Sequence, residues 1–457
     1  MRRSKAKPSR AAVEAPDLTS DDWSGRELHF IAIGGAGMSG LALVCAGLGA
    51  RVTGSDRAES SYLSRLRDAG LEPRIGHDPD QVPAGAEVVV STAIADDNPE
   101  LVRARERGQR VIRRGELLAE LCSARRLLAV SGTHGKTTTA GMLVHALRAT
   151  GAEPCFFLGG ELPGAGPGGS PANAGWGAGE WVIAEADESD GSFLDLGPEV
   201  AVITNVELDH HSRWSSRAEL LEAFGRFAGS ASALALLADP ALDPIAAGSS
   251  GTRPVARFDA GAPGPGELSL RVPGRHNVLN ARAALAGIEL AGIELGPAAE
   301  ALGSFPGILR RQERKGSRRG AEIYDDYAHH PTEVEATLEA LRELEPRRLI
   351  AVFQPHLYSR TKALARRFGA ALAAADEVGV LDVYAAREQP VGELAGVSGL
   401  DVARAAADHA GGRPVLWLRD LQTAERVLAP RLGEGDLLVT IGAGDVFRLG
   451  EALVQGS

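Results

Sequence analysis

The sequence predicts an α/β protein of three domains, each built on a doubly wound, largely parallel sheet. At 457 residues the chain is long enough for about three domains that each bury a core of their own. Short apolar runs alternate with helix-like segments, and two of the runs lead directly into glycine loops at 34–40 and 132–135. With 56 glycines and 5% aromatic residues, the composition suits layers that are joined by tight turns. We therefore expect ligands at the carboxyl ends of the strands, where open α/β sheets bind them.

Net charge and cysteine content exclude some binding partners and some kinds of structural site. The formal net charge of −11 argues against a general nucleic-acid binder and against a protein that binds anionic membranes. Three scattered cysteines are too few for a disulfide framework or a zinc cluster. No apolar run approaches the roughly 18 residues of a membrane span, so we expect a cytoplasmic protein. Residues 1–23 carry hardly any apolar side chains and are predicted to form a disordered tail.

The first domain is predicted over residues 24–124 and carries a nucleotide-binding pattern. Its first strand runs into the glycines of 34–40, which fit the G-x-G-x-x-G spacing, and a helix is predicted at 41–48. The next strand ends in Asp56, whose carboxylate can accept a hydrogen bond from a ribose hydroxyl, and a third strand ends at Ser91. The pattern predicts a site for a nucleotide diphosphate, with a purely structural glycine turn as the alternative. The choice between a dinucleotide and a nucleotide sugar stays open.

The central domain, predicted over 125–318, is organised around a second glycine loop. A strand leads into Gly132 and then into Gly135-Lys136-Thr137, before a helix predicted at 140–147. Backbone N–H groups, the helix N-terminus and the lysine favour phosphate, and the threonine hydroxyl suits Mg²⁺. The loop is shorter than the usual P-loop, because two residues rather than four separate Gly132 from the Gly-Lys-Thr step. An ordinary glycine-rich turn is the alternative, but one of only five lysines in the chain falls here.

Polar side chains follow two further strands of the central domain. Glu185 comes directly after one apolar run, and Asp209-His210 lies beyond the next. Hard oxygen ligands suit Mg²⁺, so Glu185 is the leading candidate for a metal ligand, with a solvated carboxylate cluster as the alternative. The Gly- and Pro-rich stretch at 159–179, which contains Asn173, is predicted to be a mobile surface loop.

Two other stretches of this domain carry amide or cationic side chains. The amides at 276–280 precede an alanine-rich helix, where they can contact an adenine edge or, as the sequence alone favours, cap the helix. The basic residues at 310–315 form the densest cationic cluster in the second half of the chain. That cluster is either a solvated linker or a source of positive charge for a transferring phosphoryl group.

The third domain is predicted over 319–457 as a second doubly wound sheet. One strand enters the histidine-containing run at 325–331, and the next ends in another such run at 354–361. Histidines at strand ends suit acid–base chemistry near neutral pH, although helix caps and packed polar residues are the alternative.

In combination these motifs resemble the Mur ligase family from about residue 28 to the end of the chain. The segments that carry the resemblance are Gly132-Thr133-His134-Gly135-Lys136-Thr137, Glu185-Ala186-Asp187-Glu188-Ser189-Asp190, Asn205 with Asp209-His210, His276-Asn277 with Asn280-Ala281, and Asp325-Asp326-Tyr327-Ala328-His329-His330-Pro331. The family implies a Rossmann-like N-terminal domain for the UDP end of the substrate, a central ATPase domain with the phosphate loop, and a Rossmann-like C-terminal domain for the amino acid. ATP and Mg²⁺ are the implied cofactors.

The resemblance also implies roles for individual residues. UDP would be held by Gly35, Ala36, Gly37, Met38, Ser39, Asp56 and Ser91. ATP would be held by Gly132, Thr133, His134, Gly135, Lys136, Thr137, Thr138, His276, Asn280 and Arg311. Mg²⁺ would be bound by Thr137, Glu185 and His210, and the amino acid by Tyr327, His329, His356 and Arg360. The catalytic residues would be Lys136, His210, His329 and Arg311.

The implied reaction is an ATP-dependent ligation through an acyl phosphate. Residues 353–361 favour the family member that joins L-alanine to the lactyl carboxylate of UDP-N-acetylmuramate. We expect a monomer or a weak homodimer. The alternatives are a recycling ligase that attaches a whole murein peptide and a nucleotide-sugar sensor without turnover. No lysine lies between Lys136 and Lys315, which argues against later-step members that use a carbamoylated lysine.

Three positions depart from the family pattern. Ser212 stands where an aspartate is frequent, Gln312 where a phenylalanine is frequent, and Leu357 where an arginine is frequent. With Gln312, the aromatic packing of adenine that the family pattern implies is not expected at this position. With Leu357, Arg360 becomes the expected contact of the carboxylate.

Overall fold

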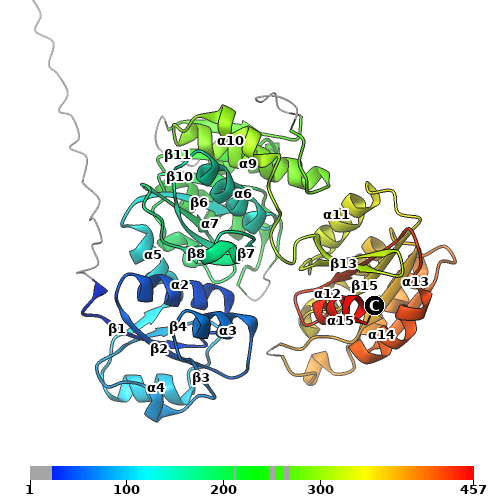
Figure 1. Cartoon of the computed structure of the whole chain (residues 1–457), viewed down its shortest axis with the longest axis horizontal. Coiled ribbons are helices and arrows are strands. Elements are labelled where there is room, and N and C mark those ends of the chain that lie inside the picture. The colour runs from blue at the N-terminus through cyan, green and yellow to red at the C-terminus, as the bar shows by residue number, and fades with distance from the viewer. Residues whose placement is uncertain (1–22, 210–212, 248–252, 262–267, 387, 457) are drawn as a thin grey trace, which may run out of the picture.

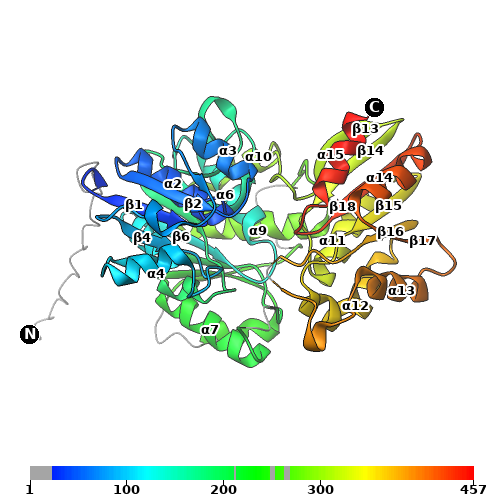
Figure 2. The ribbon, with the colours of Figure 1, turned by 90° about the horizontal axis from the view of Figure 1, so that it is seen from below.

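The computed structural model describes residues 23–209, 213–247, 253–261, 268–386 and 388–456. It contains three separate sheets, which Figure 1 shows in the blue-to-cyan, green and yellow-to-red parts of the chain. Figure 2 shows that the third of these parts faces the other two, with α11 and α12 on the side toward α9 and α7. The fold is therefore α/β with three layered units, as the sequence predicts.

The first sheet has the strand order β3-β2-β1-β4-β5, and all of its pairs are parallel. The helix after the first glycine loop begins at Ala36, five residues earlier than predicted. Trp23, which we assigned to the N-terminal tail, is 1% exposed and belongs to the core of this unit, and the Arg26 guanidinium lies 4.3 Å from its ring. The elements are β1 (Glu27–Ile31), α2 (Ala36–Gly47), β2 (Arg51–Asp56), α3 (Ser61–Asp68), β3 (Arg74–Ile75), β4 (Glu87–Val90), α4 (Pro99–Glu106), β5 (Val111–Arg113) and α5 (Arg114–Cys122).

The central sheet has seven strands in the order β12-β11-β10-β6-β9-β7-β8. All pairs are parallel except β7 with β8, which are antiparallel. The last four residues of β7 and the whole of β8 lie in the stretch 159–179 that we predicted to be a mobile surface loop, so that prediction is wrong for these residues, and Asn173 on β8 is buried. The elements are β6 (Arg126–Ser131), α6 (Lys136–Ala149), β7 (Cys155–Leu162), β8 (Ala172–Gly175), β9 (Trp181–Glu185), β10 (Val200–Ile203), α7 (Arg217–Ser230), β11 (Ala233–Leu237), α8 (Asp243–Ala247), β12 (Val255–Phe258), α9 (Arg275–Leu290) and α10 (Leu295–Leu302).

The third sheet has the order β13-β14-β18-β15-β16-β17, with one antiparallel pair, β13 with β14, at its edge. Because β13 ends at Arg318, this sheet begins before the boundary that we predicted at 319. The elements are β13 (Glu313–Arg318), β14 (Ala321–Asp326), α11 (Pro331–Arg342), β15 (Arg348–Phe353), α12 (Tyr358–Leu372), β16 (Glu377–Leu381), α13 (Gly399–His409), β17 (Val415–Arg419), α14 (Leu421–Leu428), β18 (Asp436–Ile441) and α15 (Phe447–Gln455).

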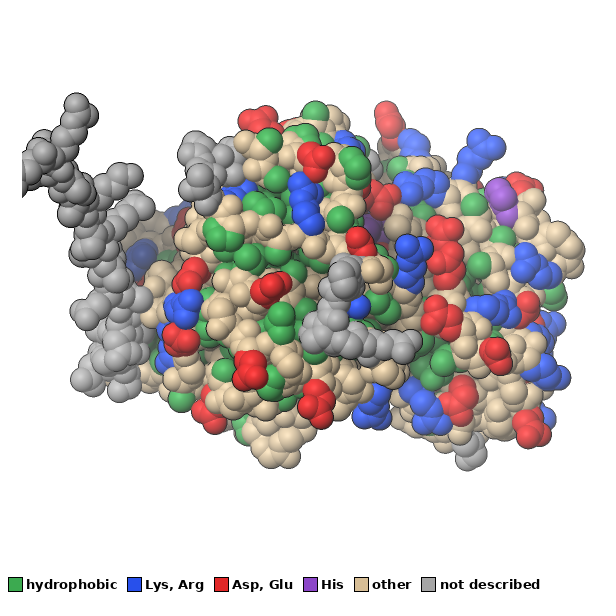
Figure 3. All heavy atoms as spheres, turned by 90° about the horizontal axis from the view of Figure 1, so that it is seen from above, with side chains coloured by type: hydrophobic (Ala, Val, Ile, Leu, Met, Phe, Trp, Pro, Cys, Tyr) green, Lys and Arg blue, Asp and Glu red, His purple; other side chains and the backbone are tan. Residues whose placement is uncertain are grey.

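The described surface is charged, and the cysteines lie in the core. Acidic and basic side chains are interspersed on the face that Figure 3 shows, most densely over the third unit at the right. The three cysteines are free and buried. Within the described ranges, no helix combines the length and the apolar character that crossing a membrane requires.

Candidate active site

The phosphate loop connects β6 to α6 and requires glycine at two positions. Gly132 has φ 133° and Gly135 has φ 81°, which side chains other than glycine rarely adopt. A Cβ added at Gly132 would lie 2.1 Å from Thr204 Oγ1, and one added at Gly135 would lie 2.3 Å from Asn280 Oδ1. Thr204 and Asn280 therefore leave no room for a side chain at these two positions of the loop. The loop leads into the N-terminus of α6, where backbone N–H groups stabilise an anion.

The amine of Lys136, the first residue of α6, is held by a buried carboxylate. Its Nζ lies 2.8 Å from Glu188 Oε2 and donates to the Gly132 carbonyl at 2.6 Å. Burial disfavours the charged amine, but Glu188 and the nearby Asp187 outweigh that effect and raise the pKa of Lys136. Burial raises the pKa of Glu188 to about 7, although Lys136 opposes the shift. Lys136 is thus a fixed cation beside the loop.

Two hard oxygen donors meet at the start of α6. Thr137 Oγ1 donates to Glu185 Oε2 at 2.8 Å, and the same carboxylate oxygen accepts from Gly159 N at 2.7 Å. A Cβ at Gly159 would lie 2.7 Å from that oxygen, so glycine keeps this space open. A hydroxyl and a carboxylate beside a phosphate loop form a donor set that fits Mg²⁺. His210, the third predicted ligand, lies outside the described residues.

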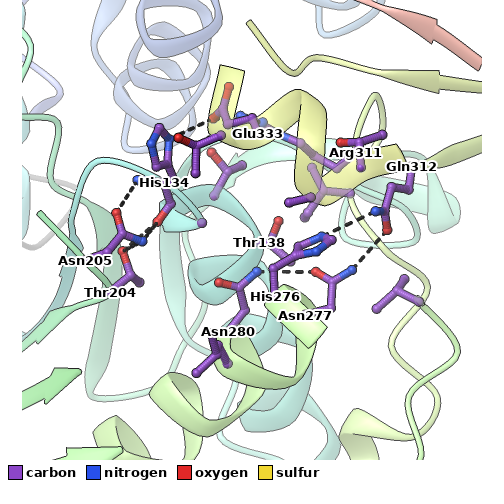
Figure 4. A pocket seen from close by; sticks show the side chains of 18 of the residues that line it. His134, Thr138, Thr204, Asn205, His276, Asn277, Asn280, Arg311, Gln312 and Glu333 are labelled. Carbon is purple, nitrogen blue, oxygen red and sulfur yellow. Dashed lines mark hydrogen bonds and ion pairs between the residues drawn. The ribbon is translucent and has the colours of Figure 1, made fainter. Parts of the chain in front are cut away.

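A cavity of about 320 Å³ adjoins the phosphate loop on the side of α9 (Figure 4). His276, Asn277 and Asn280 lie in the first two turns of α9, whose N-cap is Gly274, so the capping role that we favoured for these residues is wrong. Asn277 Nδ2 donates to the Gln312 side-chain oxygen at 3.1 Å, and His276 Nε2 lies 3.3 Å from Gln312 Nε2. Burial and the nearby Arg311 lower the pKa of His276 to about 4, so its ring is neutral. Neutral donors and acceptors of this kind suit the edge of a base.

A second cavity, of about 470 Å³, joins the first glycine loop to the phosphate loop. Its lining brings together predicted residues from all three units, namely Gly35, Ala36, Gly37, Met38, Ser91, Thr133, His134, Gly135, Lys136, Thr137, Glu185, Arg311, Tyr327 and His329. Residues that line both this cavity and the one beside α9 include Thr137 and Arg311. The site where two ligands would meet therefore lies between the phosphate loop and the junction with the third unit.

Asp56 and Ser39 support the first glycine loop instead of lining the cavity. Asp56 Oδ2 accepts from Gly34 N at 2.9 Å, and the buried Ser39 donates to the Ala36 carbonyl at 3.1 Å. The loop is also held from the central unit, because Asn173 Nδ2 donates to the same carbonyl. A contact between Asp56 and a ribose, which we expected, therefore competes with a bond that Asp56 already makes.

Sequence reasoning missed one cation at this loop. The Arg114 guanidinium lies beside Gly37, where an added Cβ would be 3.3 Å from Nη1. Its Nη2 lies 3.1 Å from Asp190 Oδ2, in the acidic segment that follows β9. Arg114 is the first residue of α5 and belongs to no glycine motif, so no local pattern in the sequence marks it. It lines the cavity because the folded chain brings the start of α5 beside the acidic segment after β9.

The aromatic residues predicted for the amino-acid side form a row. Ring centroids are 5.5 Å apart for Tyr327 and His329, and 6.4 Å apart for His329 and His356. Burial lowers the pKa of His329 to about 4. Tyr327 and His329 line the larger cavity, whereas His356 is not among the residues that line it and is stacked on Tyr384. Tyr327 and His329 are thus the members of the row that a ligand in the cavity can reach.

The two predicted arginines lie at the junction of the central and third units. Arg311 Nη1 is 3.9 Å from Glu333, and its guanidinium lies 5.2 Å from the Tyr327 ring. Arg360 Nη2 lies 3.3 Å from Asp209 Oδ1, so its charge is partly committed to the central unit. Arg311 is therefore the better placed of the two to meet a phosphate.

Two family descriptions match the chain. "Mur ligase family, catalytic domain" matches residues 27–126, and "Mur ligase, glutamate ligase domain" matches residues 310–444.

Curated relatives match nearly the whole length. A UDP-N-acetylmuramate–L-alanine ligase of Mycolicibacterium vanbaalenii is 44% identical over 94% of this chain and 96% of its own length. The protein of the same name from Kineococcus radiotolerans is 46% identical over 94% and 95%.

Solved structures share the arrangement. The UDP-N-acetylmuramate–alanine ligase MurC of Thermotoga maritima has a TM-score of 0.79 at 28% identity, over 94% of this chain and 98% of that one. A murein peptide ligase of Psychrobacter arcticus has a TM-score of 0.69 at 22% identity, over 94% and 98%, and shows a shared fold alone.

Proposed function

The chain belongs to the Mur ligase family, and we propose that it joins L-alanine to the lactyl carboxylate of UDP-N-acetylmuramate with the conversion of ATP to ADP and phosphate. It is an ATP-dependent ligase of peptidoglycan synthesis. The single observation that carries the proposal is the continuous cavity that runs from the first glycine loop to Lys136 and ends against Tyr327 and His329. One end suits a nucleotide diphosphate, the middle a transferring phosphoryl group, and the far end a small amine.

The lactyl carboxylate is a poor electrophile and must be activated first. One of its oxygens attacks the γ-phosphorus of ATP, the bond to ADP breaks, and an acyl phosphate forms. Negative charge develops on the transferring group, and Lys136 would stabilise it together with the backbone N–H groups of 135–137 at the start of α6. Arg311, which lines both cavities, would add a second cation.

Amide formation follows when the amine of L-alanine attacks the acyl carbonyl. The C–O bond to phosphate breaks, and the amine loses a proton. His329 Nδ1 lies 3.0 Å from the Tyr327 carbonyl, which places the ring N–H there and leaves Nε2 as an acceptor. His329, at the wall of the cavity with Nε2 as an acceptor, is the group that we propose to accept this proton.

The remaining predicted residues hold the nucleotide and the metal. Mg²⁺, when bound, supplies charge that neutralises the β- and γ-phosphate oxygens, and Thr137 and Glu185 would hold it together with His210. The adenine would lie against His276, Asn280 and Gln312 in the smaller cavity (Figure 4). Gln312 thus replaces aromatic packing with side-chain hydrogen bonding.

The acceptor is tested by phosphate release from ATP. Purified protein is mixed with UDP-N-acetylmuramate, ATP and Mg²⁺, and release is measured with L-alanine, glycine, L-serine or the murein tripeptide. We expect release with L-alanine. Release with the tripeptide alone would assign the chain to peptide recycling, and no release with any acceptor would indicate a sensor.

We further propose that the enzyme acts in the cytoplasm, where nucleotide substrates are made, as a monomer or weak homodimer. Light scattering over a range of protein concentrations tests the second point, and a mass that stays at two or more chains on dilution would overturn it.

A further inference from the structure

His134 of the phosphate loop contacts two carboxylates from different units, and Figure 4 shows the contact with one of them, Glu333. Its Nε2 lies 3.0 Å from Glu207 Oε2, beyond β10, and its Nδ1 lies 3.3 Å from Glu333 Oε1, on α11 of the third unit. Burial disfavours a charged ring, but the two carboxylates outweigh it and raise the pKa of His134 to about 9. Both ring nitrogens therefore donate, and the histidine is a cation between two anions.

The backbone of His134 belongs firmly to the phosphate loop. Its N–H donates to Asn205 Oδ1 at 2.9 Å, and its carbonyl accepts from Thr204 Oγ1 at 2.6 Å. One residue therefore carries both the ring that meets α11 and the backbone bonds that hold the loop before Lys136.

Glu333 connects this histidine to the amino-acid side of the site. While Oε1 meets His134, Oε2 accepts from the backbone N–H groups of His329 at 2.9 Å and His330 at 3.2 Å. The side chain is 13% exposed, and Arg311 lies 3.9 Å away. One carboxylate thus joins the phosphate loop, a junction arginine and the segment that carries His329.

Glu207 supports the same contact from the central unit. Its carboxylate accepts from Thr332 Oγ1 at 2.9 Å and from Arg367 at 3.1 Å, both in the third unit. The phosphate loop is therefore tied to α11 by two carboxylates that approach the same imidazole from opposite units.

We propose that Glu333 is a positioning residue that acts through His134, so that the phosphate loop reaches its working geometry only while α11 is docked with the amino-acid side in place. The inference rests on the proposed ligase activity. The Glu333 carboxylate bonds both to His134 of the phosphate loop and to the backbone of His329 on the amino-acid side. The position of the amino-acid side therefore affects the residues that hold ATP. Phosphoryl transfer is thereby favoured when the acceptor side is assembled.

The test is a double-mutant cycle on the full chain, with Glu333→Gln, His134→Gln and both together. Loss of one hydrogen bond between charged groups corresponds to a fall in kcat of about 10- to 100-fold for either single variant. We expect the double variant to lose no more than the worse single one, because all three break the same bridge. The KM for ATP should rise several-fold, and the KM for UDP-N-acetylmuramate should not change. A smaller fraction of folded enzyme would lower kcat alone.

Glu335→Gln is the matched control, because it removes the same charge from an exposed position on the same helix. Glu333 also caps α11, so Glu207→Gln provides a second route that leaves this cap intact. It too should raise the KM for ATP. If the wild type is active with L-alanine but Glu333→Gln behaves as Glu335→Gln does, or if the two single effects multiply, the inference is overturned while the proposed function stands. Inactive wild type under every acceptor would instead reject the proposed function.

Discussion

The two glycine loops share a strand–turn–helix design and differ in what they do with charge. The phosphate loop enters α6 through Gly135 at φ 81°, and the first helical residue is a lysine. The first loop enters α2 through Gly35 at φ −76°, in extended backbone, and the first helical residue is an alanine. Its cation, Arg114, comes from α5 and is fixed by Asp190. In the proposed reaction, the phosphate loop would bring its own cation to the reacting group, and the first loop would hold a diphosphate that does not react.

The glycines differ for a related reason. In the phosphate loop the two glycines are required by positive φ and by Thr204 and Asn280 close by. In the first loop Gly40 is required because an added Cβ would lie 2.8 Å from Ala174 Cβ, on β8 of the central unit. The first motif is thus shaped partly by a neighbouring unit, which a purely local interpretation of G-x-G-x-x-G does not anticipate.

The largest effect should follow removal of the phosphate-loop cation. Lys136→Ala is expected to lower kcat by about 10³-fold, because the charge that develops on the phosphoryl group loses its nearest amine. The KM for UDP-N-acetylmuramate should stay within twofold, since the first loop is untouched. Initial rates of phosphate release measure both. Lys362→Ala, at a side chain 48% exposed, is the matched control, and an equal loss there would contradict the assignment.

Glu185→Gln should have the next largest effect. The amide keeps the shape but weakens a carboxylate ligand, so we expect kcat to fall by about 10- to 100-fold and the Mg²⁺ concentration for half-maximal rate to rise. The rate is followed over a Mg²⁺ titration. Glu180→Gln, 67% exposed, serves as the control. An unchanged Mg²⁺ dependence in Glu185→Gln would remove this residue from the metal site.

Arg114→Ala tests the first loop. Loss of a charge-assisted contact with the diphosphate is expected to raise the KM for UDP-N-acetylmuramate by about 10-fold, with kcat changed less than threefold. The comparison predicts the opposite split from that of Lys136→Ala. A fall in kcat without a change in this KM would show that both loops serve the chemistry.

The smallest expected effect is a pH dependence of protein stability that arises from His134 in the phosphate loop. His134 has a pKa of about 9 in the folded chain and about 6.5 when unfolded. Its contribution to stability is complete below pH 6.5 and is lost as the pH rises through 9. The unfolding temperature of the wild type should therefore exceed that of His134→Gln most at pH 6.5 and least above pH 9. Arg114→Gln leaves His134 and both of its carboxylates in place, so its unfolding temperature should differ from that of the wild type by the same amount at every pH in this range.

Local patterns in the sequence predicted much of the fold and the phosphate loop. Apolar runs of strand length followed by glycine or carboxylate placed β1, β6 and β9 and the side chains at their ends, because carboxyl ends of parallel strands share an edge. Thr137 and Glu185 could be paired in this way.

What the sequence did not predict depends on contacts between distant segments. The antiparallel pair β7 and β8 lacks a regular apolar pattern, since glycines and prolines interrupt it. Glu333 and His134 are separated by 199 residues, and Arg114 and Asp190 by 76, so neither pair has a signature in spacing. Helix-capping propensity also led us to place residues 276–280 before the helix, whereas α9 begins at Arg275 and includes them.

The most direct test of the account follows an oxygen atom. UDP-N-acetylmuramate labelled with ¹⁸O in both lactyl carboxylate oxygens is incubated with the enzyme, ATP, Mg²⁺ and L-alanine, and the released phosphate is examined by mass spectrometry. If the carboxylate attacks ATP in this cavity, each phosphate carries one ¹⁸O atom and the new amide keeps the other. Phosphate without label, in a reaction that still forms the amide, would contradict activation through an acyl phosphate.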